Sequence, residues 1–142
     1  MAPLKFSIKI NAPKEKVWTT LWNDTTYRQW TAPFTPGSHA VSDWNEGSKI
    51  KFMDAKGSGM HSIIDKKIIN RQMTFKHMGE IKNGVEELKD LENALESYFL
   101  SEENGITQLD VELAMDANEE FQIYFEEVFP KALALVKQIS EN

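Results

Sequence analysis

Hydrophobic and polar residues alternate at the start of the chain. Over Leu4–Ile10 every second residue is hydrophobic, and this period of two predicts a strand with one buried face. A helix is predicted to begin near Pro13, because a proline in the first helical turn costs no hydrogen bond. Its hydrophobic residues recur at helical spacing as far as Trp22. Asn23 then breaks this helix and caps a second short one, which is predicted to run to about Trp30.

Several strand-like runs follow, and residues typical of turns separate them. The runs are Ser38–Asp43, Lys49–Asp54, Met60–Ile69, Met73–Gly79, Leu95–Leu100 and Thr107–Met115. Asn104-Gly105 lies between the last two, and this dipeptide favours tight hairpin turns because it tolerates positive φ angles. The last two runs are therefore predicted to pair with each other.

The segment 81–93 is rich in acidic residues, and its pattern is compatible with two structures. Val85–Leu91 suits either two helical turns or a charged surface loop between strands. We expect an exposed insertion with partial helix in this segment, because charged residues dominate it and no clear period of two runs through it.

The C-terminal part carries the longest helical pattern of the chain. Asp116 and Glu119 have the spacing of a capping box, and hydrophobic residues then recur at helical spacing to about Ile139. Pro130 lies inside this pattern and is predicted to kink the helix. A helix of this length spans a small domain.

Size and composition favour one globular domain. The chain has 142 residues, of which 41% are hydrophobic and 27% charged, and neither repeats nor linkers divide it. We therefore expect a single α+β domain over residues 1–142. In this domain the long C-terminal helix closes over an antiparallel sheet and leaves an apolar cavity.

Charge and residue content argue against several classes of protein. The net charge is −6, with scattered basic residues, so a nucleic-acid backbone would repel the chain. No hydrophobic run approaches the roughly 20 residues that span a bilayer, and membrane insertion is not expected. The absence of cysteine removes disulfides, thiolate metal sites and cysteine nucleophiles. The N-terminus lacks the features of a signal peptide, so a cytoplasmic location is expected.

Four segments of the chain resemble a known family in sequence, order and spacing. They are Ile10–Trp18 at the first strand–helix junction, Tyr27–Trp30 at the end of the second helix, Trp44–Phe52 and Asn104–Val111. Through them the chain resembles the AHSA1-like (activator of Hsp90 ATPase homologue 1-like) proteins of the START-like, or Bet v 1-like SRPBCC, superfamily. The resemblance implies a helix-grip fold. Its order is a strand, two helices, a meander of about six strands, and a long C-terminal helix gripped by the curved antiparallel sheet.

The family implies no single activity. Its members include carriers of lipids and hydrophobic ligands, polyketide cyclase-like enzymes, stress-response proteins and co-chaperone domains. This chain departs from the family at Thr31, where many members carry a second aromatic residue, and in the acidic stretch Glu86–Glu92. Full Hsp90 activators that resemble the family carry a further N-terminal domain, so the specific Hsp90 function is not expected here.

Candidate catalytic and metal-binding residues are few. His39, His61 and His77 lie on three different predicted strands, and their spacing matches no metal-ligand motif. Ser62 and Ser97 lack the G-x-S-x-G context of a serine nucleophile. The sequence therefore predicts no metal site, no assignable catalytic residue and no cofactor.

The chain is rich in aromatic and methionine side chains, with 4 Trp, 8 Phe, 3 Tyr and 6 Met. Those best placed to line a cavity between the sheet and the C-terminal helix are Trp30, Phe34, Trp44, Phe52, Met60, Phe75, Tyr98, Phe121, Phe125 and Phe129. His61, His77 and Tyr98 would supply polar groups. Plain core packing is the alternative for each residue, and a one-residue slip in strand register would move His61 to the opposite face.

Three functions are compatible with the sequence. The leading one is a non-enzymatic module that binds a hydrophobic or amphipathic small molecule, or a lipid-like ligand, in the cavity. The second is a cyclase- or hydrolase-type enzyme in which a cavity His or Tyr acts as acid or base. The third is a protein-interaction domain of stress or co-chaperone type, with a weak homodimer as one form of it.

Overall fold

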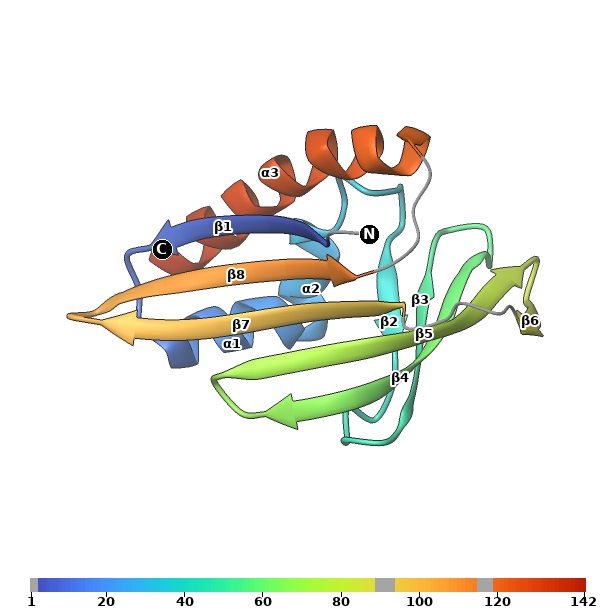
Figure 1. Ribbon diagram of the computed structural model, residues 1–142, viewed down its shortest axis with the longest axis horizontal. Helices are drawn as coiled ribbons and strands as arrows, with labels where there is room; N and C mark the ends of the chain where they lie inside the picture. The colour runs from blue at the N-terminus through green and yellow to red at the C-terminus, as the bar shows by residue number, and fades with distance from the viewer. Residues whose placement is uncertain (1–2, 89–93, 115–118) are drawn as a thin grey trace.

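The structure, a computed structural model, describes residues 3–88, 94–114 and 119–142. A single curved antiparallel sheet carries the helices of this part of the chain on one face (Figure 1). The elements are β1 (Leu4–Ile10), α1 (Lys14–Trp22), α2 (Asp24–Trp30), β2 (His39–Val41), β3 (Lys49–Met53), β4 (Gly59–Ile68), β5 (Gln72–Lys82), β6 (Val85–Leu88), β7 (Leu95–Glu103), β8 (Ile106–Ala114) and α3 (Glu119–Glu141). Helix α3 lies along β1 and also contacts α1 and α2.

The sheet has the strand order β1-β8-β7-β5-β4-β3-β2, and β6 pairs with β5 beside this path. The predicted pairing of the last two strands is confirmed. Glu103 lies opposite Ile106 next to the Asn104-Gly105 turn, and Leu95 lies opposite Ala114 at the far end. The predicted α+β helix-grip architecture is confirmed as well, because the long C-terminal helix packs on the curved antiparallel sheet.

The segment after β5 is exposed as expected, but it forms a strand, so the expectation of partial helix was wrong there. Strand β5 continues to Lys82, the chain turns at Asn83-Gly84, and Val85–Leu88 returns along β5 as β6. The two turn residues have φ angles of 50° and 81°, and tight hairpin turns require such positive values. The turn chemistry of Asn-Gly therefore outweighs the weak helical pattern that follows it. Residues 89–93 of the predicted insertion lie outside the described residues.

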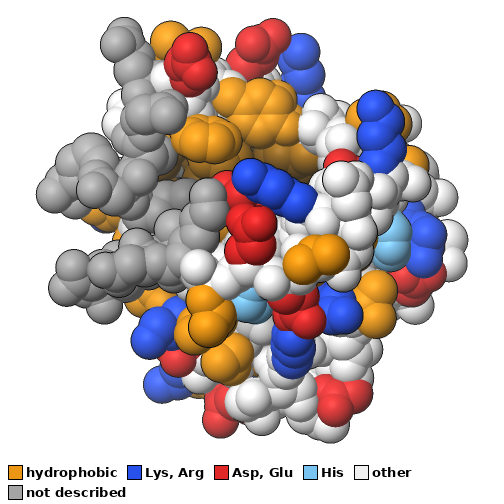
Figure 2. Space-filling view, turned by 90° about the vertical axis from the view of Figure 1, so that its right-hand side faces the viewer, with side chains coloured by type: hydrophobic (Ala, Val, Ile, Leu, Met, Phe, Trp, Pro, Cys, Tyr) orange, Lys and Arg blue, Asp and Glu red, His pale blue; other side chains and the backbone are white. Residues whose placement is uncertain are grey.

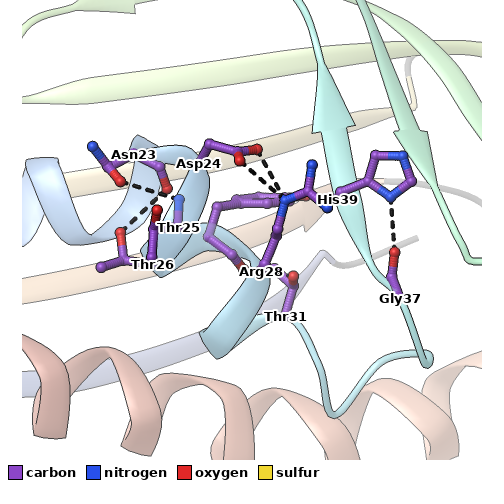
Figure 3. A network of polar contacts seen from close by, with 9 residues as sticks. Asn23, Asp24, Thr25, Thr26, Arg28, Thr31, Gly37 and His39 are labelled. Atoms are coloured by element: carbon purple, nitrogen blue, oxygen red, sulfur yellow. Dashed lines mark hydrogen bonds and ion pairs between the residues drawn. The ribbon is translucent and has the colours of Figure 1, made fainter.

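A polar joint separates the two short helices that the sequence predicted (Figure 3). The side-chain oxygen of Asn23 accepts a hydrogen bond from the backbone N–H of Thr25 at 3.1 Å and so caps α2. One turn later, Arg28 pairs with Asp24 through Nε at 3.0 Å. These contacts end α1 and start α2 within one residue, and α2 then turns back across the sheet toward β2.

Helix α3 runs from Glu119 to Glu141 and passes through Pro130 without interruption. Pro130, at which a kink was predicted, therefore does not end the helix. The predicted cap at Asp116 lies outside the described residues. The buried side chains of α3 recur at helical spacing and pack into the core: Phe129, Ala132, Leu133 and Val136.

The core lies between the helices and the face of the sheet that they cover. Its largest fully buried side chains come from every layer and include Trp30, Phe75, Ile10, Leu21, Ile50 and Ile64. Full burial of one such side chain contributes about 1.5–3 kcal/mol to stability. In the part of the chain that the structure describes, no helix combines the length and the apolar character needed to cross a bilayer.

Candidate functional site

The strand register places three polar side chains on the inner face of the sheet. Ser62 on β4 lies opposite His77 on β5, and Glu96 on β7 lies opposite Phe75 on β5. Phe75 is fully buried in the core, so its side of the sheet is the inner one. His77 stands two residues further along β5 and shares that face, because side chains of a strand alternate. Three neighbouring strands thus bring Ser62, His77 and Glu96 together under the helices.

These three side chains and Tyr98 form one hydrogen-bonded series, which we call the inner polar chain. Ser62 Oγ lies 2.6 Å from His77 Nδ1, and His77 Nε2 lies 3.1 Å from Oε1 of Glu96. The Tyr98 hydroxyl donates to Oε2 of Glu96 at 2.5 Å. Because a carboxylate only accepts, the consistent arrangement has His77 donating through Nε2 and accepting the Ser62 hydroxyl hydrogen at Nδ1.

The inner polar chain is buried except at Glu96. Ser62 is 1% and His77 3% exposed, whereas the Glu96 side chain keeps 21% of its surface accessible. Burial, reinforced by the Glu96 carboxylate, raises the pKa of Tyr98 well above its usual range, so its hydroxyl remains a donor. The ion pairs of the described residues give Glu96 no lysine or arginine partner. The accessible end of the inner polar chain is therefore the Glu96 carboxylate.

Aromatic rings pack around the inner polar chain on the side of the sheet and the two short helices. This sheet-side group consists of Trp22, Tyr27, Trp30, Trp44, Phe52, Phe75 and Tyr98. The ring of Trp22 is centred 5.0 Å from Tyr98 and 5.4 Å from Phe75. Phe52 lies 5.0 Å from Phe75 and 5.9 Å from the His77 imidazole. Edge-to-face contacts of this kind contribute about 0.5–1.5 kcal/mol each beyond burial.

A second set of rings belongs to α3 and to the elements that it touches. This helix-side group consists of Phe6, Phe34, Phe121, Tyr124, Phe125 and Phe129. Phe129 stacks on Phe6 at 4.9 Å and meets Phe34 edge-on at 4.8 Å. The Tyr124 hydroxyl donates to the backbone oxygen of Phe34 at 2.5 Å and ties the loop before β2 to α3. Among the described residues, no ring contact joins the helix-side group to the sheet-side group.

Some rings of both groups remain partly exposed although they pack against the core. They are Trp44 and Phe52 on the sheet side and Phe34 and Phe125 on the helix side. These rings and the Glu96 side chain therefore combine contact with the core and contact with solvent. At the end of the molecule where α3 begins, hydrophobic side chains reach the surface beside charged ones (Figure 2).

The residues predicted to line a cavity divide between the two groups. Trp30, Trp44, Phe52, Phe75 and Tyr98 belong to the sheet-side group, and Phe34, Phe121, Phe125 and Phe129 belong to the helix-side group. Met60 is partly buried opposite Phe52. Phe121 lies near the start of α3 and is 54% exposed. The predicted polar residues His77 and Tyr98 are both members of the inner polar chain.

His61 lies on the outer face of the sheet, and its expected place in the cavity is corrected. The neighbouring Ser62 faces inward, so alternation turns His61 outward. Its Nε2 atom lies 2.9 Å from the backbone oxygen of Glu87 on β6, and Nδ1 lies 3.7 Å from the Glu86 carboxylate. The imidazole crosses β5 at Gly79, where a Cβ atom would approach Nε2 to 2.7 Å.

An open groove of about 430 Å³ surrounds His61 on this outer face. Its lining residues are Gly47, Lys49, His61, Ser62, Ile63, Met78, Glu86 and Leu88. Lys49 and Glu86 form an ion pair along it. Ser62 borders this groove although its side chain joins the inner polar chain, so the two features meet at β4, from which His61 and Ser62 point to opposite faces of the sheet.

His39 takes part in neither feature. Its ring turns toward the loop before β2, where Nδ1 lies 2.8 Å from the backbone oxygen of Gly37 (Figure 3). The three histidines therefore occupy three separate environments. Within residues 3–88, 94–114 and 119–142, no three histidine, aspartate or glutamate side chains are grouped so that they could hold a metal ion.

Comparison with known proteins gives matches in structure. No protein-family model and no curated protein sequence matches the chain. The solved Aha1 dimer from Colwellia psychrerythraea is 20% identical with a TM-score of 0.78, and the match covers 99% of this chain and 97% of that chain. CalU16 from Micromonospora echinospora is 15% identical with a TM-score of 0.69, over 99% of this chain and 76% of that chain. DynU16, from the dynemicin biosynthetic locus, is 12% identical with a TM-score of 0.74, over 97% and 46%.

The chain has the Aha1 fold. Its resemblance to the AHSA1-like proteins of the START-like superfamily, inferred from the sequence, is thereby confirmed at the level of the fold. The Aha1 fold hosts the site without specifying its chemistry, because one architecture supports many unrelated functions. The ligand and the activity must therefore be argued from the side chains.

Two residues of the inner polar chain, Glu96 and Ser62, were not predicted from the sequence as members of the site. A signal for Glu96 was present, because the Asn104-Gly105 turn sets the register of β7 against β8. Counting back from that turn puts Glu96 opposite Leu113, on the hydrophobic face of β8. Ser62 offered no such signal, because its partner His77 lies on a strand whose register shifts next to it.

Proposed function

We propose that the protein binds a small hydrophobic or amphipathic molecule between the sheet-side and helix-side groups of rings. The polar end of the ligand meets Glu96, and its apolar part lies against the partly exposed rings. One observation carries this proposal: an inward-facing carboxylate, held by His77 and Tyr98, keeps accessible surface on the face of the sheet that carries the buried rings. Small-molecule sites are typically apolar with a few fixed polar groups, and this arrangement matches that pattern.

The separation of the two groups of rings supports the same proposal. The sheet-side group is anchored on the strands and on α1–α2, and the helix-side group is anchored on α3 and on the loop at Phe34. A ligand between them would gain contacts with both without displacing fully buried side chains such as Trp30. We propose that this binding takes place in the cytoplasm, the compartment that the sequence favours.

A paired truncation tests the proposal. Phe52→Ala combined with Phe125→Ala removes one partly exposed ring from each group, and the affinity for a fluorescent apolar probe should fall about tenfold or more. The matched control is Val85→Ala with Ile106→Ala, which shortens two exposed side chains away from both groups. Unchanged probe affinity in a folded Phe52/Phe125 variant would refute an inner site.

A hydrolytic function is the second candidate, and the Ser62–His77–Glu96 series is the observation that favours it. In such a reaction Ser62 Oγ would attack an ester carbonyl while its proton moved to His77, oriented by Glu96. The C–O bond to the alcohol would then break, the alcohol would leave with that proton, and water would release the acid from the acyl-serine. Ser62 is only 1% exposed, so a substrate carbonyl has little access to it, and binding is the better-supported function. We expect Ser62→Ala to leave turnover of a p-nitrophenyl ester unchanged. A wild-type rate that this substitution abolished would establish the hydrolase instead.

Self-association is a third, separate proposal. The Colwellia Aha1 protein was solved as a dimer, and in this chain Ile123 and Tyr124 on α3 are 57% and 37% exposed. We expect a weak homodimer through this face, detectable by light scattering at increasing concentration and reduced by Ile123→Ser. A constant monomer mass over that range would contradict it. A stress-related or co-chaperone role also stays a prediction from the family resemblance.

A further inference from the structure

The donor and acceptor content of the inner polar chain restricts the chemistry of a ligand. The Ser62 hydroxyl hydrogen is used toward His77 Nδ1, and the His77 Nε2 hydrogen is used toward Glu96. The Tyr98 hydroxyl hydrogen is used toward the other oxygen of Glu96. Each donor hydrogen of these three side chains therefore already has an acceptor within the inner polar chain.

The accessible end of the inner polar chain offers only hydrogen-bond acceptors. A carboxylate has about four lone-pair sites, and His77 and Tyr98 occupy one each. The remaining lone pairs of Glu96 can be reached by a ligand, because Glu96 is the member of the inner polar chain with substantial accessible surface. A group that meets Glu96 must bring its own hydrogen, and a positive charge on that group would add an ionic attraction.

The surroundings of Glu96 favour a cation further. No lysine or arginine of the described residues pairs with it, so none of those positive side chains competes for it. Phe75 lies opposite Glu96 where β5 pairs with β7, the Tyr98 hydroxyl binds the carboxylate, and the Phe52 ring lies 5.9 Å from the His77 imidazole. The negative faces of aromatic rings attract cations. The net charge of −6 also raises the local concentration of cations and lowers that of anions.

We propose that the site is selective for cationic amphipaths: molecules with a protonated amine head group and an apolar tail. This inference rests on the proposed function and deepens it by naming the class of ligand. The ammonium head group donates to the free lone pairs of Glu96. The tail then runs between the sheet-side and helix-side groups of rings, along Phe52 and Phe125.

A set of matched probes tests this selectivity. Decylammonium, decanol and decanoate share one tail and differ in head-group charge, and calorimetric titration below their aggregation limits gives the three affinities. We expect decylammonium to bind about tenfold or more tightly than decanol, and decanoate to bind weakest. Glu96→Gln should abolish the preference for decylammonium over decanol. The matched control Glu86→Gln, in the outer groove, should leave the preference intact.

The outcomes separate this inference from the proposed function. If decanol and decylammonium bind equally, or decanoate binds best, the cationic class is overturned while an apolar site stands. If none of the three binds, the proposed function falls together with the inference. Glu96→Asp keeps the charge and should keep the preference, which checks that Glu96→Gln acts through charge. Should neither variant fold, the order of affinities in the wild-type protein still decides the question.

Discussion

The Glu96 carboxylate shows how neighbouring side chains can hold a charged group on an apolar face. Removing a carboxylate from water is costly unless hydrogen bonds replace its hydration. Here His77 and Tyr98 bind one oxygen each, and burial keeps the Tyr98 hydroxyl protonated by raising its pKa. Ser62 completes the arrangement by holding the far nitrogen of His77. A ligand that met Glu96 would find these partners already in place, which would lower the entropic cost of binding.

Gly79 is a residue whose substitution should damage the sheet directly, between β5 and β6. A Cβ atom there would come within 1.8 Å of the Glu87 backbone oxygen and 2.7 Å of His61 Nε2. We expect Gly79→Ala to lower the free energy of unfolding by about 1–3 kcal/mol, because β6 must move away from β5. Urea denaturation measures this change. His61→Ala is the comparison, because it removes the hydrogen bond to Glu87 and the contact with Glu86 but forces no movement of β6. Equal stability of Gly79→Ala and wild type would contradict the packing described for β6.

At the scale of elements, local patterns predicted the fold well where they were periodic. The alternation over Leu4–Ile10 and the helical spacing before Glu141 identified β1 and α3, because each has one buried face. The Asn104-Gly105 turn predicted the β7–β8 hairpin correctly. The equivalent Asn83-Gly84 turn is followed by an acidic segment with weak helical spacing, and this spacing hides β6 in the sequence.

The candidate site was harder to predict, because it depends on pairing between strands that are distant in sequence. Ser62 and His77 are 15 positions apart, and His77 and Glu96 are 19 apart. The pairing of β4 with β5 also shifts between His61 and Ser62. Local periodicity cannot reveal such a shift, so the sequence left open whether His61 or Ser62 faces inward. The aromatic residues were easier to select, since large apolar side chains are buried in most registers.

The whole molecule joins two groups of rings that belong to different parts of the fold. The sheet-side group lies on the sheet and on α1 and α2, and the helix-side group lies mainly on α3 and the loop at Phe34. A ligand between them would contact both parts at once and would stabilise the folded state by mass action. The outer groove at His61 could not do this, because it lies on the face away from α3. The face of the sheet that a ligand occupies therefore distinguishes the inner site from the outer groove.

Intermolecular nuclear Overhauser effects between decylammonium and the protein measure that location directly. We predict contacts from the decyl chain to the rings of Phe52 and Phe125, and from the carbon next to the ammonium group to Tyr98. These residues lie on the inner side of the sheet and on α3. Contacts confined to Met78 and Leu88 would place the ligand in the outer groove and contradict the account.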